Sequence, residues 1–300
     1  MNSVPFQSPP EVTYAVVETV APLIRRVVAR NPSRMTARGT ATYIVGHGQV
    51  AVIDPGPALA EHVDALLAAL RGETVAHILV THTHRDHSPA AAAIRAATGA
   101  PTLGYGPHGG GEGEFSDGGA DLAFVPDRAL GDGDAVEGKG YVLRAVHTPG
   151  HTSNHLCFAL EEPGGGGVLF PGDHVMGWST SVVVPPDGDM RAYVRSLEKL
   201  LARDDGLYMP THGAPIADPK PYVRALIAHR HERTAGILAR LRAGDRRIPE
   251  LVAALYAGLP DGLRRPAGWS VLAHLIELIE DGRVACEGKP GLEGEYRVRG

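Results

Sequence analysis

Residues 81–87 read Thr-His-Thr-His-Arg-Asp-His and follow directly after the apolar run of residues 75–80. The apolar run predicts a buried strand, which places the seven-residue motif at a strand end. In an extended segment, side chains two residues apart point to the same side, so His82 and His84 can direct two imidazoles to one point. We therefore expect the fold to be organised around a strand end that carries potential metal ligands.

The turn after this strand adds a second pair of potential ligands, Asp86 and His87. A helix is predicted over residues 89–98, with Ser88 as its N-cap and Gly99 at its end. Such a turn can bring the second pair close to the first. Three histidines and a carboxylate that are buried together leave polar groups poorly satisfied unless they bind a cation. The motif therefore predicts a pair of divalent cations.

Length, composition and charge describe a globular chain. The 300 residues are 43% hydrophobic and 21% charged, with a formal net charge of −5. This length favours one large domain or two. The negative charge argues against a protein that coats nucleic acid by bulk electrostatics.

The sequence also predicts a chain without a membrane partner. No apolar run approaches the length of about 20 residues that spans a bilayer. Residues 1–10 hold no basic residue and no apolar core, which argues against a secretory signal. Cys157 and Cys286 lie far apart in the sequence and are expected to be reduced packing residues. We therefore expect a cytoplasmic location.

The first part of the chain alternates strands and helices. Gly46 and Gly48 separate two segments rich in β-branched residues and predict a hairpin. The order strand, helix, strand, motif, helix is typical of an α/β fold. The predicted strands cover residues 23–29, 40–45, 50–53 and 75–80, and the predicted helices cover residues 61–70 and 89–98.

Three polar residues near the motif need separate interpretations. Asp54 ends a strand before a Pro-Gly turn, and it is either a turn residue or a carboxylate that orients a metal-bound histidine from behind. His108 lies in a glycine-rich stretch and is expected to be a solvated surface residue. His147 is expected to belong to the strand of residues 141–147 and not to the metal site.

A potential ligand beside a glycine turn at a strand end recurs three more times. His151 follows Thr-Pro-Gly, Asp173 ends Phe-Pro-Gly-Asp, and His212 lies in Pro-Thr-His-Gly. A tight Pro-Gly turn projects the next side chain out of the strand end. In the company of the other ligands, Asp173 can bridge two cations through its two oxygens. The elements around these residues are strands over residues 141–147, 156–160 and 168–170, a hairpin tip at residues 164–167, and a helix over residues 190–203.

After residue 219 the pattern changes to helices. A long helix over residues 221–242 carries a basic face, because residues 219–247 hold eight Lys or Arg against two acids. Further helices are predicted over residues 250–256 and 271–279, and two strands over residues 283–286 and 295–298 resemble a wing. We therefore divide the chain into residues 1–218 and a helical, winged-helix-like domain of residues 219–300.

The ordered ligand set resembles that of the metallo-β-lactamase superfamily, in its glyoxalase-II-like form. The motif His-x-His-x-Asp-His is followed by one histidine, one aspartate and one histidine, each in a matching local context, and the likeness covers residues from about 23 to 215. The tail looks like that of the lactamase-beta-2-like branch. The resemblance implies a four-layer αβ/βα sandwich. It also implies that His82, His84 and His151 hold one metal, that Asp86, His87 and His212 hold the second, and that Asp173 bridges them.

The chemistry that this resemblance implies is hydrolysis. The cofactor would be two Zn²⁺ ions, with iron or manganese compatible with the same nitrogen and oxygen ligands. One zinc ion alone brings the pKa of bound water to about 7, so a hydroxide on the metals can attack a carbonyl carbon. Asp86 would orient this nucleophile and Asp173 would hold both metals, so these two residues are the predicted catalytic carboxylates.

Two classes of substrate stay open from the sequence. We favour a small-molecule thioester, ester or lactone, with a pocket that includes Trp178, Tyr222, Arg230 and His231. The alternative is a nuclease that acts on single-stranded nucleic acid, in which the basic helix of residues 219–247 would contact phosphates. The oligomeric state is open between a monomer and a homo-oligomer.

Overall fold

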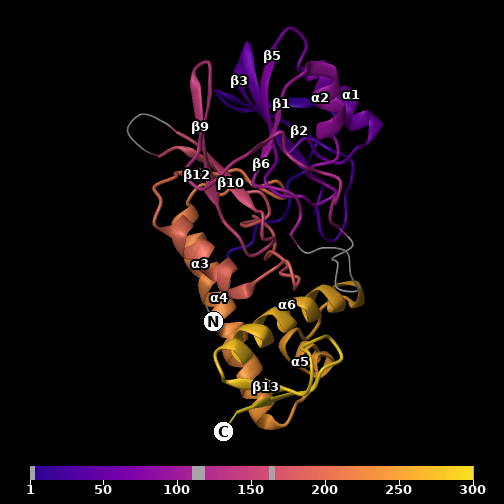
Figure 1. The fold of residues 1–300 in the computed structure, drawn as a ribbon, viewed down its shortest axis with the longest axis vertical. Helices are drawn as coiled ribbons and strands as arrows, with labels where there is room; N and C mark the ends of the chain where they lie inside the picture. The colour runs from indigo at the N-terminus through magenta and orange to yellow at the C-terminus, as the bar shows by residue number, and fades with distance from the viewer. Residues whose placement is uncertain (1–3, 110–118, 162–165, 300) are drawn as a thin grey trace.

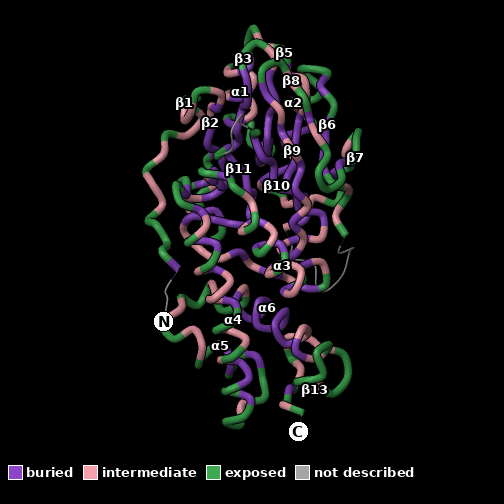
Figure 2. The backbone as a smooth tube through the Cα atoms, turned by 90° about the vertical axis from the view of Figure 1, so that its left-hand side faces the viewer, coloured by how far each residue is buried: buried purple, intermediate pink, exposed green. Residues whose placement is uncertain are grey.

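The computed structural model describes residues 4–109, 119–161 and 166–299. Two β-sheets form the upper part of the molecule, and the C-terminal helices form the lower part (Figure 1). The strands in the middle of the upper part are mostly buried, whereas exposed residues concentrate in the connections (Figure 2). The hairpin tip predicted at residues 164–167 lies partly outside the described residues.

The first sheet contains the strand that precedes the histidine motif. The first four of its seven strands pair antiparallel with their neighbours. The fourth strand then pairs parallel with the fifth, and the parallel pairing continues to the seventh. The predicted hairpin is confirmed, since His47 pairs with Gln49. In spatial order the strands are β1 (Val17–Ala21), β2 (Ile24–Val28), β3 (Ala41–His47), β4 (Gln49–Ile53), β5 (Thr74–Leu79), β6 (Thr102–Gly104) and β7 (Arg128–Ala129).

The second sheet carries the later ligands. Its strands pair antiparallel except for the last pair, β11 with β12, which is parallel. The three strands predicted around His151 and Asp173 are confirmed residue for residue. The strands are β8 (Ala135–Gly138), β9 (Tyr141–His147), β10 (Leu156–Leu160), β11 (Val168–Phe170) and β12 (Leu207–Tyr208), in the spatial order β12-β11-β10-β9-β8.

The two sheets face each other across one hydrophobic core, and helices cover their outer faces. In β4, Ala51 and Ile53 point into this core, whereas Val50 and Val52 point to the helix side. β10 alternates in the same way, with Phe158 facing the other sheet. Because these strands are buried on both faces, they read as continuous apolar runs. The predicted four-layer αβ/βα sandwich is confirmed.

Two pairs of helices complete the layers. Helices α1 (Ala60–Ala69) and α2 (Ala91–Thr98) cover the first sheet, mainly through Leu66 and Ile94. Helix α3 (Met190–Leu201) and the first half of α4 (Pro219–Ala243) cover the second sheet. No helix in the described part of the chain has the length and apolar character needed to cross a membrane.

The C-terminal region has its own core. Helices α5 (Ile248–Leu255) and α6 (Asp261–Glu280) pack with the antiparallel pair β13 (Val284–Cys286) and β14 (Tyr296–Val298). The second half of α4 joins this core through Ile237 and Leu241, while its first half joins the core of the second sheet through Tyr222 and Leu226. The division at residue 219 stays a prediction, because α4 belongs to both cores.

Two local expectations were wrong. Helix α6 begins at Asp261 and not at residue 271, because burial of Ala267 and Trp269 in the C-terminal core offsets the cost of Pro266 inside the helix. Ser88 does not cap α2, whose N-cap is Ala90 without a side-chain hydrogen bond. The Ser88 hydroxyl instead donates to the carboxylate of Asp121 at 2.6 Å.

Candidate metal centre

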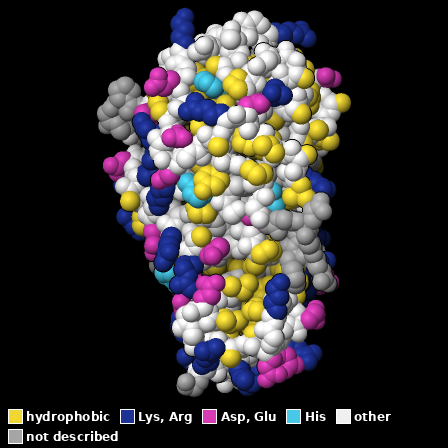
Figure 3. Space-filling model, viewed as in Figure 1, with side chains coloured by type: hydrophobic (Ala, Val, Ile, Leu, Met, Phe, Trp, Pro, Cys, Tyr) yellow, Lys and Arg dark blue, Asp and Glu magenta, His cyan; other side chains and the backbone are white. Residues whose placement is uncertain are grey.

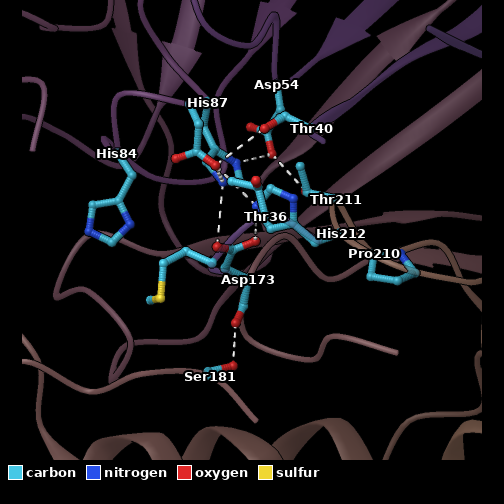
Figure 4. A network of polar contacts seen from close by, with 12 residues as sticks. Thr36, Thr40, Asp54, His84, His87, Asp173, Ser181, Pro210, Thr211 and His212 are labelled. Atoms are coloured by element: carbon cyan, nitrogen blue, oxygen red, sulfur yellow. Dashed lines mark hydrogen bonds and ion pairs between the residues drawn. The ribbon is translucent and has the colours of Figure 1, made fainter. Parts of the chain in front are cut away.

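The predicted ligands come together at one edge of the two sheets, beyond the ends of the strands. Figure 4 shows four of them, His84, His87, Asp173 and His212. The motif follows β5, and the three later ligands follow β9, β11 and β12. In the described part of the chain, two groups of side chains have ligand atoms within 4.8 Å of one another. They are His82, His84, His151 and Asp173, and Asp86, His87 and His212.

The first group has the spacing of a tetrahedral nitrogen site. Nε2 of His82 lies 2.9 Å from Nδ1 of His84, and Nε2 of His151 lies 3.1 Å from the same atom. Nitrogen atoms bound to one zinc ion at about 2.0–2.1 Å in tetrahedral geometry lie about 3.3 Å apart. These three imidazoles therefore fit around a single cation.

The second group faces the first across Asp173. Nε2 of His212 lies 3.1 Å from Oδ2 of Asp86, and Nε2 of His87 lies 3.5 Å from the same oxygen. The two carboxylate oxygens of Asp173 lie 3.5 Å from Nε2 of His87 and 3.3 Å from Nε2 of His212. Nε2 of His151, from the first group, lies 3.8 Å from Oδ2 of Asp173. The Asp173 carboxylate thus lies between the two groups.

Hydrogen bonds on the far side of the rings aim the imidazoles at the centre. Nδ1 of His151 lies 2.6 Å from the Val182 carbonyl oxygen, and Nδ1 of His212 lies 3.0 Å from that of Gly39. An imidazole whose Nδ1 donates to a carbonyl presents the lone pair of Nε2 to a metal. The loops that contain Gly39 and Val182 therefore help to orient the candidate ligands.

Several ligand atoms at the centre are buried without a hydrogen-bond partner. They include Nε2 of His87, Nε2 of His212 and Oδ1 of Asp173. Buried polar atoms are normally paired, and an unpaired one costs free energy. A cation between them would satisfy all three, so the residues present fit a metal centre.

The protonation of His82 and Asp173 suits a cation. Burial lowers the pKa of His82 well below its usual value, and the nearby charge of His87 lowers it further, so His82 is a neutral ligand. Burial opposes ionisation of Asp173, but the charges of His212 and His87 outweigh it and hold its pKa well below the usual range. Neutral imidazoles and ionised carboxylates are the donor set that zinc and related divalent metals prefer. Burial opposes the charged form of His87 and His212, but the charges of Asp86 and Asp173 outweigh it and raise the pKa of both imidazoles, so each must lose a proton to bind a metal.

Asp54 supports the second group from behind. Its carboxylate accepts hydrogen bonds from the Thr81 backbone N–H at 2.8 Å, the Thr81 hydroxyl at 2.8 Å and the Thr211 hydroxyl at 3.1 Å. It also lies 2.9 Å from Nδ1 of His87. Of the two interpretations open from the sequence, the geometry supports the orienting carboxylate. The left-handed backbone of Asp54, at φ 49°, turns the chain at the same point.

Replacement of Asp54 by asparagine is expected to weaken divalent-cation binding at the candidate centre by about 10–100-fold, the usual cost of losing a partner behind a metal ligand. Asparagine has one acceptor oxygen for four donors, so His87 loses its fixed orientation. Competition against a chromophoric chelator measures the affinity. The control is Asp64→Asn on the exposed face of α1, and equal affinities in the two variants would contradict the orienting role.

A cavity of about 650 Å³ opens above the two groups. One wall carries the ligands, and the facing wall comes from α6 through Arg265, Pro266 and Trp269. Met35 and Met176 add apolar surface between them. The sequence did not identify Met35, Arg265, Pro266 or Trp269, because their place at this cavity depends on how the C-terminal region packs over the candidate ligands.

The four predicted substrate residues occupy different places. Trp178 and Arg230 line a second cavity that adjoins the first. Tyr222 is 3% exposed in the hydrophobic core, and its hydroxyl donates to the Met176 carbonyl at 2.7 Å. His231 is exposed and lines a third cavity on α4. Tyr222 and His231 are not among the described residues that line the cavity above the candidate ligands.

For the two other histidines interpreted from the sequence, the structure confirms one expectation and contradicts the other. His147 lies in β9 as predicted, and its Nε2 is 3.1 Å from the Ser153 carbonyl oxygen. His108 is not a solvated surface residue, because its side chain is 3% exposed and Nδ1 lies 3.2 Å from the Thr83 hydroxyl. The glycine-rich sequence around it hid this tertiary contact.

Comparisons with known proteins agree with this geometry. Residues 35–212 match the family model of the metallo-beta-lactamase superfamily, and residues 248–292 match that of the beta-lactamase associated winged helix domain. The predicted winged-helix-like end is thereby confirmed.

Similar proteins cover nearly the whole chain. The lactamase-like protein adaB of Aspergillus niger is 33% identical over 94% of this chain and 88% of its own length. An atrochrysone carboxyl ACP thioesterase of Emericella nidulans is 30% identical over 95% of this chain and 87% of its own. The crystal structure of a metallo-beta-lactamase family protein from Thermus thermophilus superposes with a TM-score of 0.73 at 26% identity, over 94% of this chain and 100% of that one.

Proposed function

The chain belongs to the metallo-β-lactamase superfamily, and from this premise we propose that it is a hydrolase that cleaves thioesters at a centre of two divalent cations. The observation that carries this proposal is that two groups of potential ligands lie on either side of the Asp173 carboxylate in the wall of a cavity. Relatives named as atrochrysone carboxyl ACP thioesterases support the choice of a thioester. The substrate would be a small-molecule thioester or an acyl group on a carrier.

The ligand set suggests which residues hold each cation. His82, His84 and His151 would hold the first, Asp86, His87 and His212 the second, and Asp173 both. Zinc suits these nitrogen and oxygen donors best, and iron or manganese is compatible with them. When bound, such a pair of cations would lower the pKa of a water molecule and polarise the substrate carbonyl.

The protein side chains supply orientation and exclude water. Asp86 lines the cavity, and its Oδ2 accepts a hydrogen bond from the Thr40 hydroxyl at 3.2 Å, which restrains the carboxylate beside His212. Held there, Asp86 can accept a hydrogen bond from the attacking water and orient it. The apolar wall formed by Met35, Met176 and Trp269 covers the acyl group and keeps bulk water from the reacting carbon.

The basic helix is less suited to nucleic acid than its sequence suggests. Lys220 pairs with Asp204, Arg240 with Asp245 and Arg247 with Glu295. Because these charges are matched within the protein, less positive charge remains to contact phosphates. We therefore keep the thioesterase as the proposal and the nuclease as the alternative. Both described cysteines are free thiols, which is consistent with a cytoplasmic location.

We expect the purified, metal-replete protein to hydrolyse at least one member of a panel of glutathione and coenzyme A thioesters. A chelator should abolish this turnover, and stoichiometric zinc should restore it, because the candidate ligands have no other means to activate water. Elemental analysis before and after chelation gives the number of ions per chain. A labelled single-stranded RNA is the parallel substrate. Cleavage of the RNA without turnover of any thioester would overturn the proposal in favour of the nuclease.

A further inference from the structure

A second cavity adjoins the one above the candidate ligands, and its lining includes two arginines and a tryptophan. It measures about 140 Å³. Four residues line both cavities, Met35, Met176, Val182 and Pro266, so a molecule over the metal ligands can extend into this space. The face of the molecule over the C-terminal helices shows a hydrophobic patch with Lys and Arg side chains beside it (Figure 3).

The polar groups on the walls of the second cavity are mainly hydrogen-bond donors. Arg34 reaches it from the loop between β2 and β3, Arg230 from α4, and Trp178 from the loop after Asp173. Hydroxyl groups of Thr180 and Ser270 add to them. The described residues that line this cavity include no aspartate or glutamate. Its electrostatic character is therefore positive.

Arg230 is the most unusual of these residues. It is 2% exposed, and its Nη2 donates to the Ser181 carbonyl, which also lies on the cavity wall. Its guanidinium lies 4.9 Å from the centre of the Tyr193 ring. Nε has no hydrogen-bond partner, and Arg230 forms no ion pair with any described carboxylate. A buried cation without a counter-charge is costly, so a ligand that supplies negative charge would be stabilised there.

Trp178 provides a second, independent donor without a partner. Its indole Nε1 is buried and makes no hydrogen bond with the described residues. The residue comes from a different segment of the chain than Arg230, and both line the same cavity. Native proteins leave few buried donors unpaired, and those that remain commonly await water, an ion or a ligand. Two residues that line one cavity and each carry such a donor indicate a missing acceptor.

We propose that Arg34, Trp178 and Arg230 form an anion subsite that binds an oxyanion of the substrate while the scissile carbonyl lies over the candidate metal ligands. This inference rests on the proposed thioesterase function and defines its substrate as an anionic thioester. The oxyanion is either a carboxylate on the acyl group or the phosphate of a pantetheine arm. Both accept hydrogen bonds from guanidinium and indole N–H groups.

Four thioesters separate these two sources. Pentanoyl and glutaryl groups, each on pantetheine and on 4′-phosphopantetheine, vary the acyl carboxylate and the carrier phosphate independently. We expect the wild type to have a higher kcat/KM for the thioesters that carry one of the two anions, either the acyl carboxylate or the carrier phosphate. Trp178→Phe removes the indole N–H and keeps an aromatic ring, and Arg34→Gln removes an exposed charge. Each of these two variants should reduce the ratio of kcat/KM between the charged thioester and its uncharged counterpart by about tenfold, the scale of a hydrogen bond to a charged group.

Matched variants and a binding measurement make the result decisive. Arg38 is an exposed arginine of the same loop that pairs with Glu11 and does not line the cavity, so Arg38→Gln should keep the wild-type preference. Calorimetric titration of the metal-replete protein with glutarate and with 4′-phosphopantetheine detects the subsite without turnover. Weaker binding of the preferred anion to Trp178→Phe and Arg34→Gln supports the subsite even if no thioester is cleaved. Unchanged binding and unchanged preference in both variants overturn it.

Discussion

Replacement of Asp173 by alanine is expected to lower kcat/KM for thioester hydrolysis by at least about a thousandfold, the scale of losing a group central to transition-state stabilisation. The Asp173 carboxylate lies between the two ligand groups and faces the Nε2 atoms of His87, His151 and His212. Without it, each group keeps only its remaining ligands, and nothing in this position holds the two cations at a fixed separation. Elemental analysis should show that the variant retains fewer ions per chain.

The control for this variant is another polar residue of the same sheet. His147 lies in β9, stacks on Tyr105 and belongs to neither ligand group, so His147→Ala should bind both metals and keep activity. Circular dichroism should show the same fold for both variants, because the Asp173 backbone carbonyl still accepts the Ser181 hydroxyl. An Asp173→Ala protein that retains two ions and wild-type turnover would contradict the bridging role.

The candidate metal centre could be predicted because its potential ligands are local features of the sequence. Each candidate ligand lies shortly after a strand, and His151 and Asp173 also follow a Pro-Gly turn. Strands buried on both faces, such as β10, are continuous apolar segments and are easy to recognise. The resemblance to the metallo-β-lactamase superfamily, which the family model confirms, then ordered these local features into one fold.

The cavities around the candidate ligands could be predicted only in part, because their residues meet only in the folded chain. Trp178 and Arg230 were predicted as pocket residues, whereas Arg34, Met35 and the residues of α6 were not. Arg34, Trp178 and Arg230 are far apart in the sequence, and only the packing of α4 and α6 against the sandwich brings them to one cavity. A local signal was misleading in two cases. Ser88 is a good helix cap by type but donates to Asp121, and Pro266 hid the first half of α6.

Replacement of Gly150 by alanine is expected to lower the free energy of unfolding by about 3 kcal/mol, the upper end of the typical cost of forcing an extra group into packed structure. A Cβ atom at Gly150 would lie 2.3 Å from both the backbone N and the Cα of Tyr193 in α3. The residue also has a φ of 137°, which side chains rarely adopt. The turn and the helix would have to separate, and His151, which follows directly, would move away from His84.

The cost of backbone strain can be separated from the cost of this contact. Gly140 has a φ of 82°, but a Cβ atom there would meet nothing within 4 Å, so Gly140→Ala should cost only about 1 kcal/mol. Urea unfolding of both variants, with metal content measured in parallel, gives the comparison. A larger loss in Gly150→Ala, together with weaker metal retention, would show that contact with α3 holds the His151 turn in place. Equal losses of unfolding free energy in the two variants would instead mean that backbone conformation accounts for the whole effect. Contact with α3 would then not be what holds the His151 turn in place.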